Sequence, residues 1–148
     1  MIKFKKILLV EDNPNDVELT VEALTASNLA NRIITVKDGV EALEYLLYEG
    51  EYKNREKDMP AVILLDIKMP RMDGIEVLQK IKSDVDLRSI PIVMLTSSKE
   101  EPDLKRCYDL GVNAYVVKPL NFCDFNESVR QIGLFWAVIN ELPTNGGN

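Results

Sequence analysis

Short apolar runs alternate along this chain with longer segments of mixed polarity. Each run is four or five residues long, the usual length of a strand, and most are nearly continuous in Val, Ile and Leu. Continuous apolar runs are typical of strands that are covered on both faces, as the strands of parallel sheets are. The pattern predicts five strands, at residues 6–10, 32–36, 61–65, 92–95 and 114–117.

Between these runs, apolar residues recur at the spacing of an amphipathic helix, as Val17, Val21 and Leu24 do. Asn13-Pro14 suits a helix start, and Gly111 suits a helix end. The charged stretch at 49–59 has no apolar period and predicts a solvated loop. The expected helices lie at roughly 14–27, 40–48, 75–83, 100–110 and 122–141.

Strands that alternate with helices favour an α/β fold, with a parallel sheet covered on both faces. Right-handed crossovers then place the carboxyl ends of all strands at one edge of the sheet. A chain of 148 residues suits one domain with one core. We expect that domain to span residues 1–142 and to be followed by a disordered tail at 143–148.

The amino-acid composition argues against several classes of function. The formal net charge of −6 disfavours nucleic acid as a partner. No stretch approaches the roughly 20 apolar residues of a membrane span, and no cleavage site follows the short apolar N-terminal run. Two cysteines without metal-type spacing suit a cytoplasmic protein. The chain contains no histidine, so a phosphohistidine or a histidine-based triad cannot form within it.

The residues that follow four of the strands have reactive or charged side chains. Glu11-Asp12 follow the first run, Asp66 the third, Thr96 the fourth and Lys118 the fifth. Since open α/β sheets bind ligands at the carboxyl ends of their strands, we expect these groups to meet there. Three carboxylates, a hydroxyl and an ammonium at one site are what a Mg²⁺-assisted phosphorylation of an aspartate requires.

Each of these residues also has an ordinary explanation. The acidic pair could be a solvated helix N-terminus, where the helix dipole favours carboxylates. Asp66 could cap a helix. Thr96 and Lys118 could be surface residues. The functional interpretation depends on all of them occurring together, with Asp66 followed by a loop that contains Met69-Pro70 and Asp73-Gly74.

In this combination the sequence resembles the receiver domain of two-component response regulators over nearly its whole length. The matching motifs are the acidic pair after the first run, LLDIKMPRMDG around Asp66, MLTS around Thr96 and VVKPL around Lys118. The resemblance implies a doubly wound, flavodoxin-like sheet with strand order 2-1-3-4-5. Single-domain receivers that partner bacterial phytochromes are the most similar type, given the EDNPNDVEL start, the charged loop and the LFW of the last helix.

The resemblance assigns roles to the site residues. It makes Asp66 the phosphoacceptor, and it places Mg²⁺ on Glu11, Asp12, Asp66 and the backbone carbonyl of Lys68. A carboxylate nucleophile, oxygen ligands and Mg²⁺ are chemically consistent with one another.

The remaining roles concern phosphoryl binding and signalling. Lys118 and Thr96 would bind phosphoryl oxygens, which makes them the catalytic pair of the site. Thr96 and the aromatic Tyr115 would form the switch that reports phosphorylation, although Tyr115 is equally compatible with an ordinary half-buried strand tyrosine. The resemblance also implies a cis peptide bond before Pro119.

The last predicted helix has two apolar sectors. One is expected to cover the sheet. The second suggests a contact surface for a homodimer, although a wider core stripe would also account for it. The residues of this second sector are Leu134, Phe135, Val138 and Leu142.

These observations favour a signalling module over an enzyme. The module would receive phosphate from a sensor histidine kinase, with a bacterial phytochrome as the suggested kinase, and would act on a downstream protein target. Its own activity would be weak autophosphorylation and autodephosphorylation. A Mg²⁺ phosphatase is the second interpretation, but such enzymes place an aspartate two residues after the nucleophile, where this chain has Lys68. A scaffold without phosphorylation is the third, and the complete set of site residues disfavours it.

Overall fold

A computed structural model describes residues 6–25, 33–97, 100–118 and 127 of the chain. The described strands form one five-stranded parallel sheet in the order β2-β1-β3-β4-β5. This confirms the predicted α/β class and the strand order implied by the resemblance. The strands are β1 (Ile7–Val10), β2 (Ile33–Val36), β3 (Val62–Leu65), β4 (Ile92–Thr96) and β5 (Ala114–Val117).

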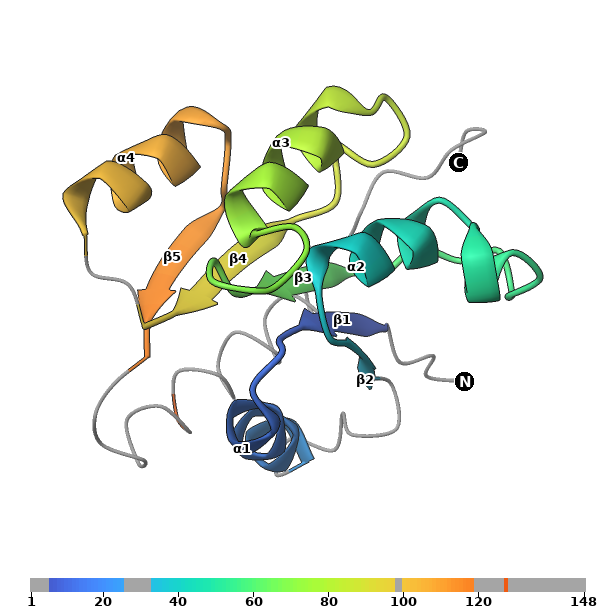
Figure 1. Cartoon of the computed structure of the whole chain (residues 1–148), viewed down its shortest axis with the longest axis horizontal. Helices are drawn as coiled ribbons and strands as arrows, with labels where there is room; N and C mark the ends of the chain where they lie inside the picture. Colours follow the sequence, from blue (N-terminus) through green and yellow to red (C-terminus); the bar gives the residue numbers. More distant parts are fainter. Residues whose placement is uncertain (1–5, 26–32, 98–99, 119–126, 128–148) are drawn as a thin grey trace.

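Helices cover both faces of the sheet. Helix α1 (Pro14–Thr25) lies on one face, and α2 (Gly39–Leu46), α3 (Gly74–Ser83) and α4 (Glu101–Asp109) lie on the other (Figure 1). The layers follow from the period of two along each strand, because successive side chains point to opposite faces. Accordingly Leu9 and Leu64 pack in the cluster that contains Leu24 of α1. Leu8 and Ile63 pack in the cluster that contains Leu78 of α3.

The helix ends have recognisable caps. The side chain of Asp38 accepts a hydrogen bond from the backbone N–H of Glu41 at the start of α2. Asp73 and Glu76 form a reciprocal capping box at the start of α3. Gly111 follows α4 with a φ of +97°, a backbone conformation that favours glycine. These caps explain why the observed helix bounds agree closely with the predicted ones.

The prediction of a solvated loop at residues 49–59 is confirmed only in part, by the exposure of most of these residues. The segment is not simply a solvated loop, because it contains a short 3-10 helix, η2 (Gly50–Tyr52), and packs against α2. The rings of Tyr45 and Tyr52 make an edge-to-face contact at 5.1 Å between centroids. The guanidinium of Arg55 lies 3.8 Å from the ring centroid of Tyr45 and 4.1 Å from that of Tyr48. These edge-to-face and cation–π contacts order a segment that its polar composition alone would predict to be a solvated loop.

Several predictions concern residues outside those described. They are the cis bond before Pro119, the last helix with its second apolar sector (Leu134, Phe135, Val138 and Leu142), and the tail at 143–148. Among the described helices, none is long and apolar enough to cross a membrane.

Candidate functional site

The carboxyl ends of β1, β3 and β5 bring four charged side chains together. The Lys118 ammonium donates a hydrogen bond to Oε1 of Glu11 at 2.7 Å and lies 3.8 Å from Oδ2 of Asp66. Glu11, Asp12 and Asp66 each offer a carboxylate oxygen, and these oxygens lie within 4.8 Å of one another. The meeting of these groups, expected from the parallel sheet, is therefore present in the structure.

Backbone hydrogen bonds from neighbouring strands hold the residues in place. The N–H of Glu11 donates to the carbonyl of Val36 at 3.0 Å, and the N–H of Asp66 donates to the carbonyl of Val10 at 3.1 Å. The N–H of Lys118 donates to the carbonyl of Thr96 at 2.7 Å. The site residues thus continue the hydrogen-bond pattern of the sheet by one step beyond each strand. Rigid elements of this kind position reactive groups better than free loops do.

The two carboxylate oxygens of Asp66 have different surroundings. Oδ1 accepts a hydrogen bond from the backbone N–H of Ile67 at 2.8 Å, whereas Oδ2 faces the Lys118 ammonium. The residue is 8% exposed, so its carboxylate is largely shielded from water. One oxygen is held by the backbone, and the other lies beside a cation that can stabilise a group attached there.

Burial makes the carboxylate of Glu11 costly to ionise. Burial, followed by the charge of Asp66, raises the pKa of Glu11 from 4.5 to about 7, and the hydrogen bond from Lys118 only partly opposes this. Burial would also lower the pKa of Lys118, but hydrogen bonds to Asp16 and Glu11 more than offset it and raise that pKa. The ammonium therefore stays charged, and the excess of carboxylates around it favours the arrival of a further cation.

The donor set suits a hard divalent cation. Mg²⁺ prefers oxygen ligands and is usually held by one or two carboxylates together with several waters. Asp12 is exposed while Glu11 and Asp66 are buried, so the cluster has an open side through which water can complete the coordination. Among the described residues this is the one cluster of at least three possible metal ligands.

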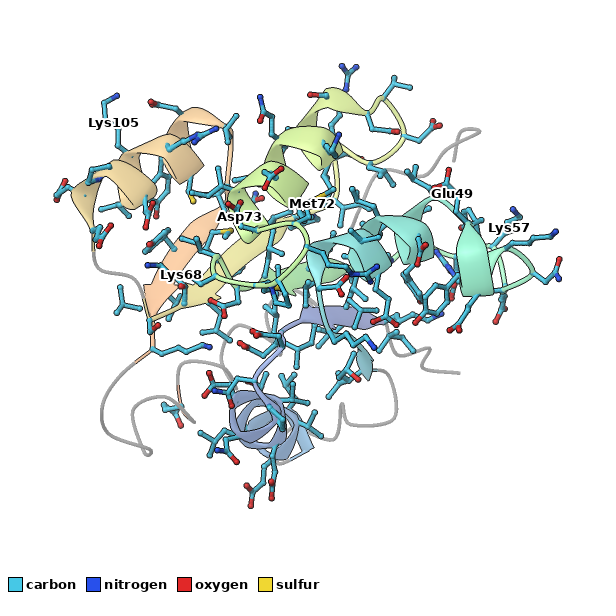
Figure 2. The ribbon with its side chains drawn as sticks, viewed as in Figure 1. Glu49, Lys57, Lys68, Met72, Asp73 and Lys105 are labelled. Carbon is cyan, nitrogen blue, oxygen red and sulfur yellow. The ribbon has the colours of Figure 1, made fainter. Side chains whose placement is uncertain are left out.

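The other predicted site residues lie on β4, on β5 and on the loop after β3. Thr96 is fully buried at the end of β4, and Tyr115 is half-buried on β5 and pairs with Met94 in the sheet register. Lys68 is exposed on the loop between β3 and α3, and Figure 2 shows it with Met72 and Asp73 on that loop. Pro119 is outside the described residues.

Asp16 also belongs to this site, although the sequence assigns it no role there. Its Oδ2 accepts a hydrogen bond from the Lys118 ammonium at 2.7 Å, as short as the bond from that ammonium to Glu11. The side chain comes from the first turn of α1, which β1 leads into directly. The only signal in the sequence is an acidic residue in the first turn of a helix, which is common because of the helix dipole.

Comparisons with known proteins support the family that the sequence motifs resemble. A family model described as the response regulator receiver domain matches residues 7–130. Response regulator Rcp1 of Synechocystis sp. is 42% identical over 139 residues, which cover 94% of this chain and 93% of Rcp1.

Solved structures agree with this result. The phosphorylated cyanobacterial phytochrome response regulator RcpA is 45% identical and matches with a TM-score of 0.88, covering 96% of this chain and 100% of RcpA. The Mn²⁺-bound form of Rcp1 is 41% identical with a TM-score of 0.86, covering 95% of this chain and 99% of that structure. Both the fold and the family are therefore shared with phytochrome response regulators over almost the full length of each protein.

Proposed function

This chain belongs to the response regulator receiver domain family, and on that basis we propose that it accepts a phosphoryl group on Asp66 from a sensor histidine kinase. One observation carries the proposal: Oδ2 of Asp66 lies 3.8 Å from the Lys118 ammonium, inside a cluster of carboxylates that can hold a divalent cation. The chain is a signalling module, and its own catalytic activity is limited to weak autophosphorylation and autodephosphorylation.

In the transfer step, a carboxylate oxygen of Asp66 forms a bond to phosphorus while the bond from phosphorus to the imidazole nitrogen of the donor breaks. The electron pair of the broken bond stays on the imidazole, which takes up a proton from water. An acyl phosphate on Asp66 and a free histidine on the kinase result. These 148 residues contain no histidine, so the donor imidazole lies outside them.

Mg²⁺ would be held by Glu11, Asp12 and Asp66, with the backbone carbonyl of Lys68 as a further ligand. The cation supplies the positive charge that offsets repulsion between the carboxylate and the phosphoryl oxygens. The three carboxylates lie within the distance that one ion can bridge, which supports this assignment. The Mn²⁺-bound form of Rcp1 supports a divalent cation in the same family.

Lys118 would bind one phosphoryl oxygen and Thr96 another. Thr96 ends β4 beside the site, and its carbonyl accepts a hydrogen bond from the N–H of Lys118. A movement of either residue therefore displaces the other. Tyr115 lies on the neighbouring strand, with its ring packed against the larger core cluster. We assign Thr96 and Tyr115 to a two-state switch that phosphorylation biases. A cis bond before Pro119 would help to aim the ammonium.

The partner proposals rest on the relatives. RcpA is described as a phytochrome response regulator, so a phytochrome-type sensor kinase is the proposed donor, and the cytoplasm is the proposed location of this chain. The signal would then pass to a protein target through a changed surface. Leu134, Phe135, Val138 and Leu142, in the helix predicted at 122–141, would form a homodimer interface.

Phosphotransfer from an autophosphorylated sensor histidine kinase tests the proposal. Radiolabel should move from the kinase to the wild-type chain when Mg²⁺ is present and should not move when the metal is chelated. Asp66→Asn should take up none, whereas Asp84→Asn, which changes an aspartate at the far end of α3, should behave as wild type. Equal labelling of the wild type and Asp66→Asn would refute the assignment of the phosphoacceptor.

A further inference from the structure

The Lys118 ammonium has more carboxylate partners than the proposed reaction uses. It donates to Glu11 and to Asp16, both at 2.7 Å, while Oδ2 of Asp66 is farther away at 3.8 Å. The ammonium is thus drawn toward α1 and away from the oxygen beside which it would have to act. Asp16 has no role in the metal cluster, which consists of Glu11, Asp12 and Asp66.

The carboxylate of Asp16 is available because another residue caps the helix. Oδ1 of Asn13 accepts hydrogen bonds from the backbone N–H groups of Asn15 at 2.9 Å and of Asp16 at 3.2 Å. These contacts satisfy donors that a first-turn carboxylate often satisfies itself. The side chain of Asp16 is therefore free to bind Lys118.

A cation bound at the carboxylate cluster would change how strongly Glu11 and Asp16 attract the Lys118 ammonium. Glu11 would then share its charge with the metal, which weakens its attraction for Lys118. Asp16 lies outside the cluster and keeps its full charge, so it becomes the main competitor for the ammonium. Its side chain is 28% exposed, compared with 3% for Glu11, and a partly hydrated ion pair of this kind can be broken at low cost.

We propose that Asp16 is a competing counterion, which holds the Lys118 ammonium until a phosphoryl group displaces it and thereby slows phosphorylation of Asp66. The inference rests on the proposed function, since it concerns the rate of that reaction. It makes Asp16 a positioning residue that acts through Lys118 and does not touch the phosphoryl group. A residue that served only the helix dipole would affect stability and leave this rate unchanged.

Asp16→Asn removes the charge while keeping the size of the side chain. The initial rate of phosphorylation by acetyl phosphate and Mg²⁺ should rise by about fivefold, the effect expected for loss of a partly exposed ion pair. Asp16→Glu retains a carboxylate and should remain closer to wild type. Glu18→Gln is the matched control, because Glu18 is an exposed carboxylate on the same helix, and it should show the wild-type rate.

A second measurement needs neither the metal nor a phosphodonor. The hydrogen-exchange rate of the Lys118 ammonium, followed by nitrogen-15 nuclear magnetic resonance on the metal-free protein, should increase in Asp16→Asn and stay unchanged in Glu18→Gln. Loss of a hydrogen-bond acceptor exposes the ammonium protons to water, which explains the expected increase.

The outcomes separate the two claims. If the wild type takes up no phosphate, the proposed function fails. If the wild type is phosphorylated but Asp16→Asn reacts at the same rate or more slowly, the competition is refuted and the function stands. Unchanged exchange of the Lys118 ammonium in Asp16→Asn would also overturn the inference, because the ion pair would then not exist in solution.

Discussion

Arg71 binds Asp38 through two hydrogen bonds, from Nε to Oδ2 at 2.8 Å and from Nη2 to Oδ1 at 3.0 Å. The pair joins the loop between β3 and α3 to the turn between β2 and α2, which are 33 residues apart in the sequence. Arg71 has a φ of +64°, a conformation that costs a non-glycine residue some energy. The contact therefore holds the loop that carries Lys68 in a defined shape.

Replacement of Arg71 by alanine should destabilise the protein. Asp38 has a side chain only 4% exposed and would lose its charged partner, keeping the hydrogen bond from Glu41. Arg71 itself is 53% exposed, so solvent screening limits the loss to about 1 kcal/mol in the free energy of unfolding. Urea denaturation measures it. Arg88→Ala removes an exposed arginine from the turn after α3 and should change the midpoint little; equal losses would contradict the account.

Gly74 lies against the backbone of Asp66, the proposed phosphoacceptor. A Cβ atom built at this position would lie 2.0 Å from the carbonyl oxygen of Asp66, so Gly74→Ala must displace that backbone. We expect a loss of about 1–3 kcal/mol in the free energy of unfolding, together with slower phosphorylation by acetyl phosphate.

Gly50→Ala is the control for this change. Gly50 has a φ of +56°, so alanine is strained there too, but the residue lies on η2, away from the site. This variant should lose about 1 kcal/mol and keep its phosphorylation rate. If Gly74→Ala kept the wild-type rate, the close packing of Gly74 against Asp66 would not matter for the site.

The pKa of Glu11 predicts how stability depends on pH. In the folded protein this pKa is raised from 4.5 to about 7, so between these values the folded state holds a proton that the unfolded state has lost. The stability of the metal-free protein should therefore decrease as the pH rises through this window. Mg²⁺ affinity should increase over the same range and level off above pH 7, because the metal requires the carboxylate form.

Denaturant titrations from pH 4.5 to 8, with and without Mg²⁺, measure this effect. Glu11→Gln has no ionisable group at this position, so its free energy of unfolding should vary much less with pH. A metal-free protein whose stability rises steadily through this window would show that Glu11 ionises normally in the folded state.

Arg55 should contribute to stability although it lies in a segment of mostly exposed, polar residues. Its Nε donates to the carbonyl of Tyr45 at 2.8 Å, and its guanidinium lies between the rings of Tyr45 and Tyr48. Arg55→Lys keeps the charge but loses the planar group, so we expect a loss of about 1 kcal/mol. Lys53→Arg, at an exposed position of the same segment, is the control. A thermal or urea midpoint equal to wild type in Arg55→Lys would refute this role.

Much of the fold could be predicted because local patterns and the global structure agree. Apolar runs of strand length and well-capped helices each carry their own signal, and the polar residues that end the runs predict which edge of the sheet is functional. The order of the strands came from the resemblance to receiver domains and could not be obtained from the hydrophobic pattern alone.

The features that were missed depend on contacts between distant segments. In the sequence Asp16 differs from Glu18 only in lying in the first turn of the helix, where acidic residues are common. Only the side chain of Lys118, the residue after β5, gives the Asp16 carboxylate its partner. The pairing of Arg71 with Asp38 needs a left-handed backbone at a residue that is not glycine. The segment around Arg55 carries no hydrophobic period, because its 3-10 helix has only three residues and Arg55 itself lies beyond it.

Above all, we propose that the carboxylate of Asp66 takes up the phosphoryl group at this edge of the sheet. Incubation with acetyl phosphate and Mg²⁺, followed by intact mass spectrometry and peptide mapping, shows whether it does. We expect one added phosphoryl group, located on Asp66, absent from Asp66→Asn and absent after chelation of the metal. A wild-type chain that stays unmodified with every donor and also fails to bind beryllofluoride, or a phosphoryl group mapped to another residue, would contradict it.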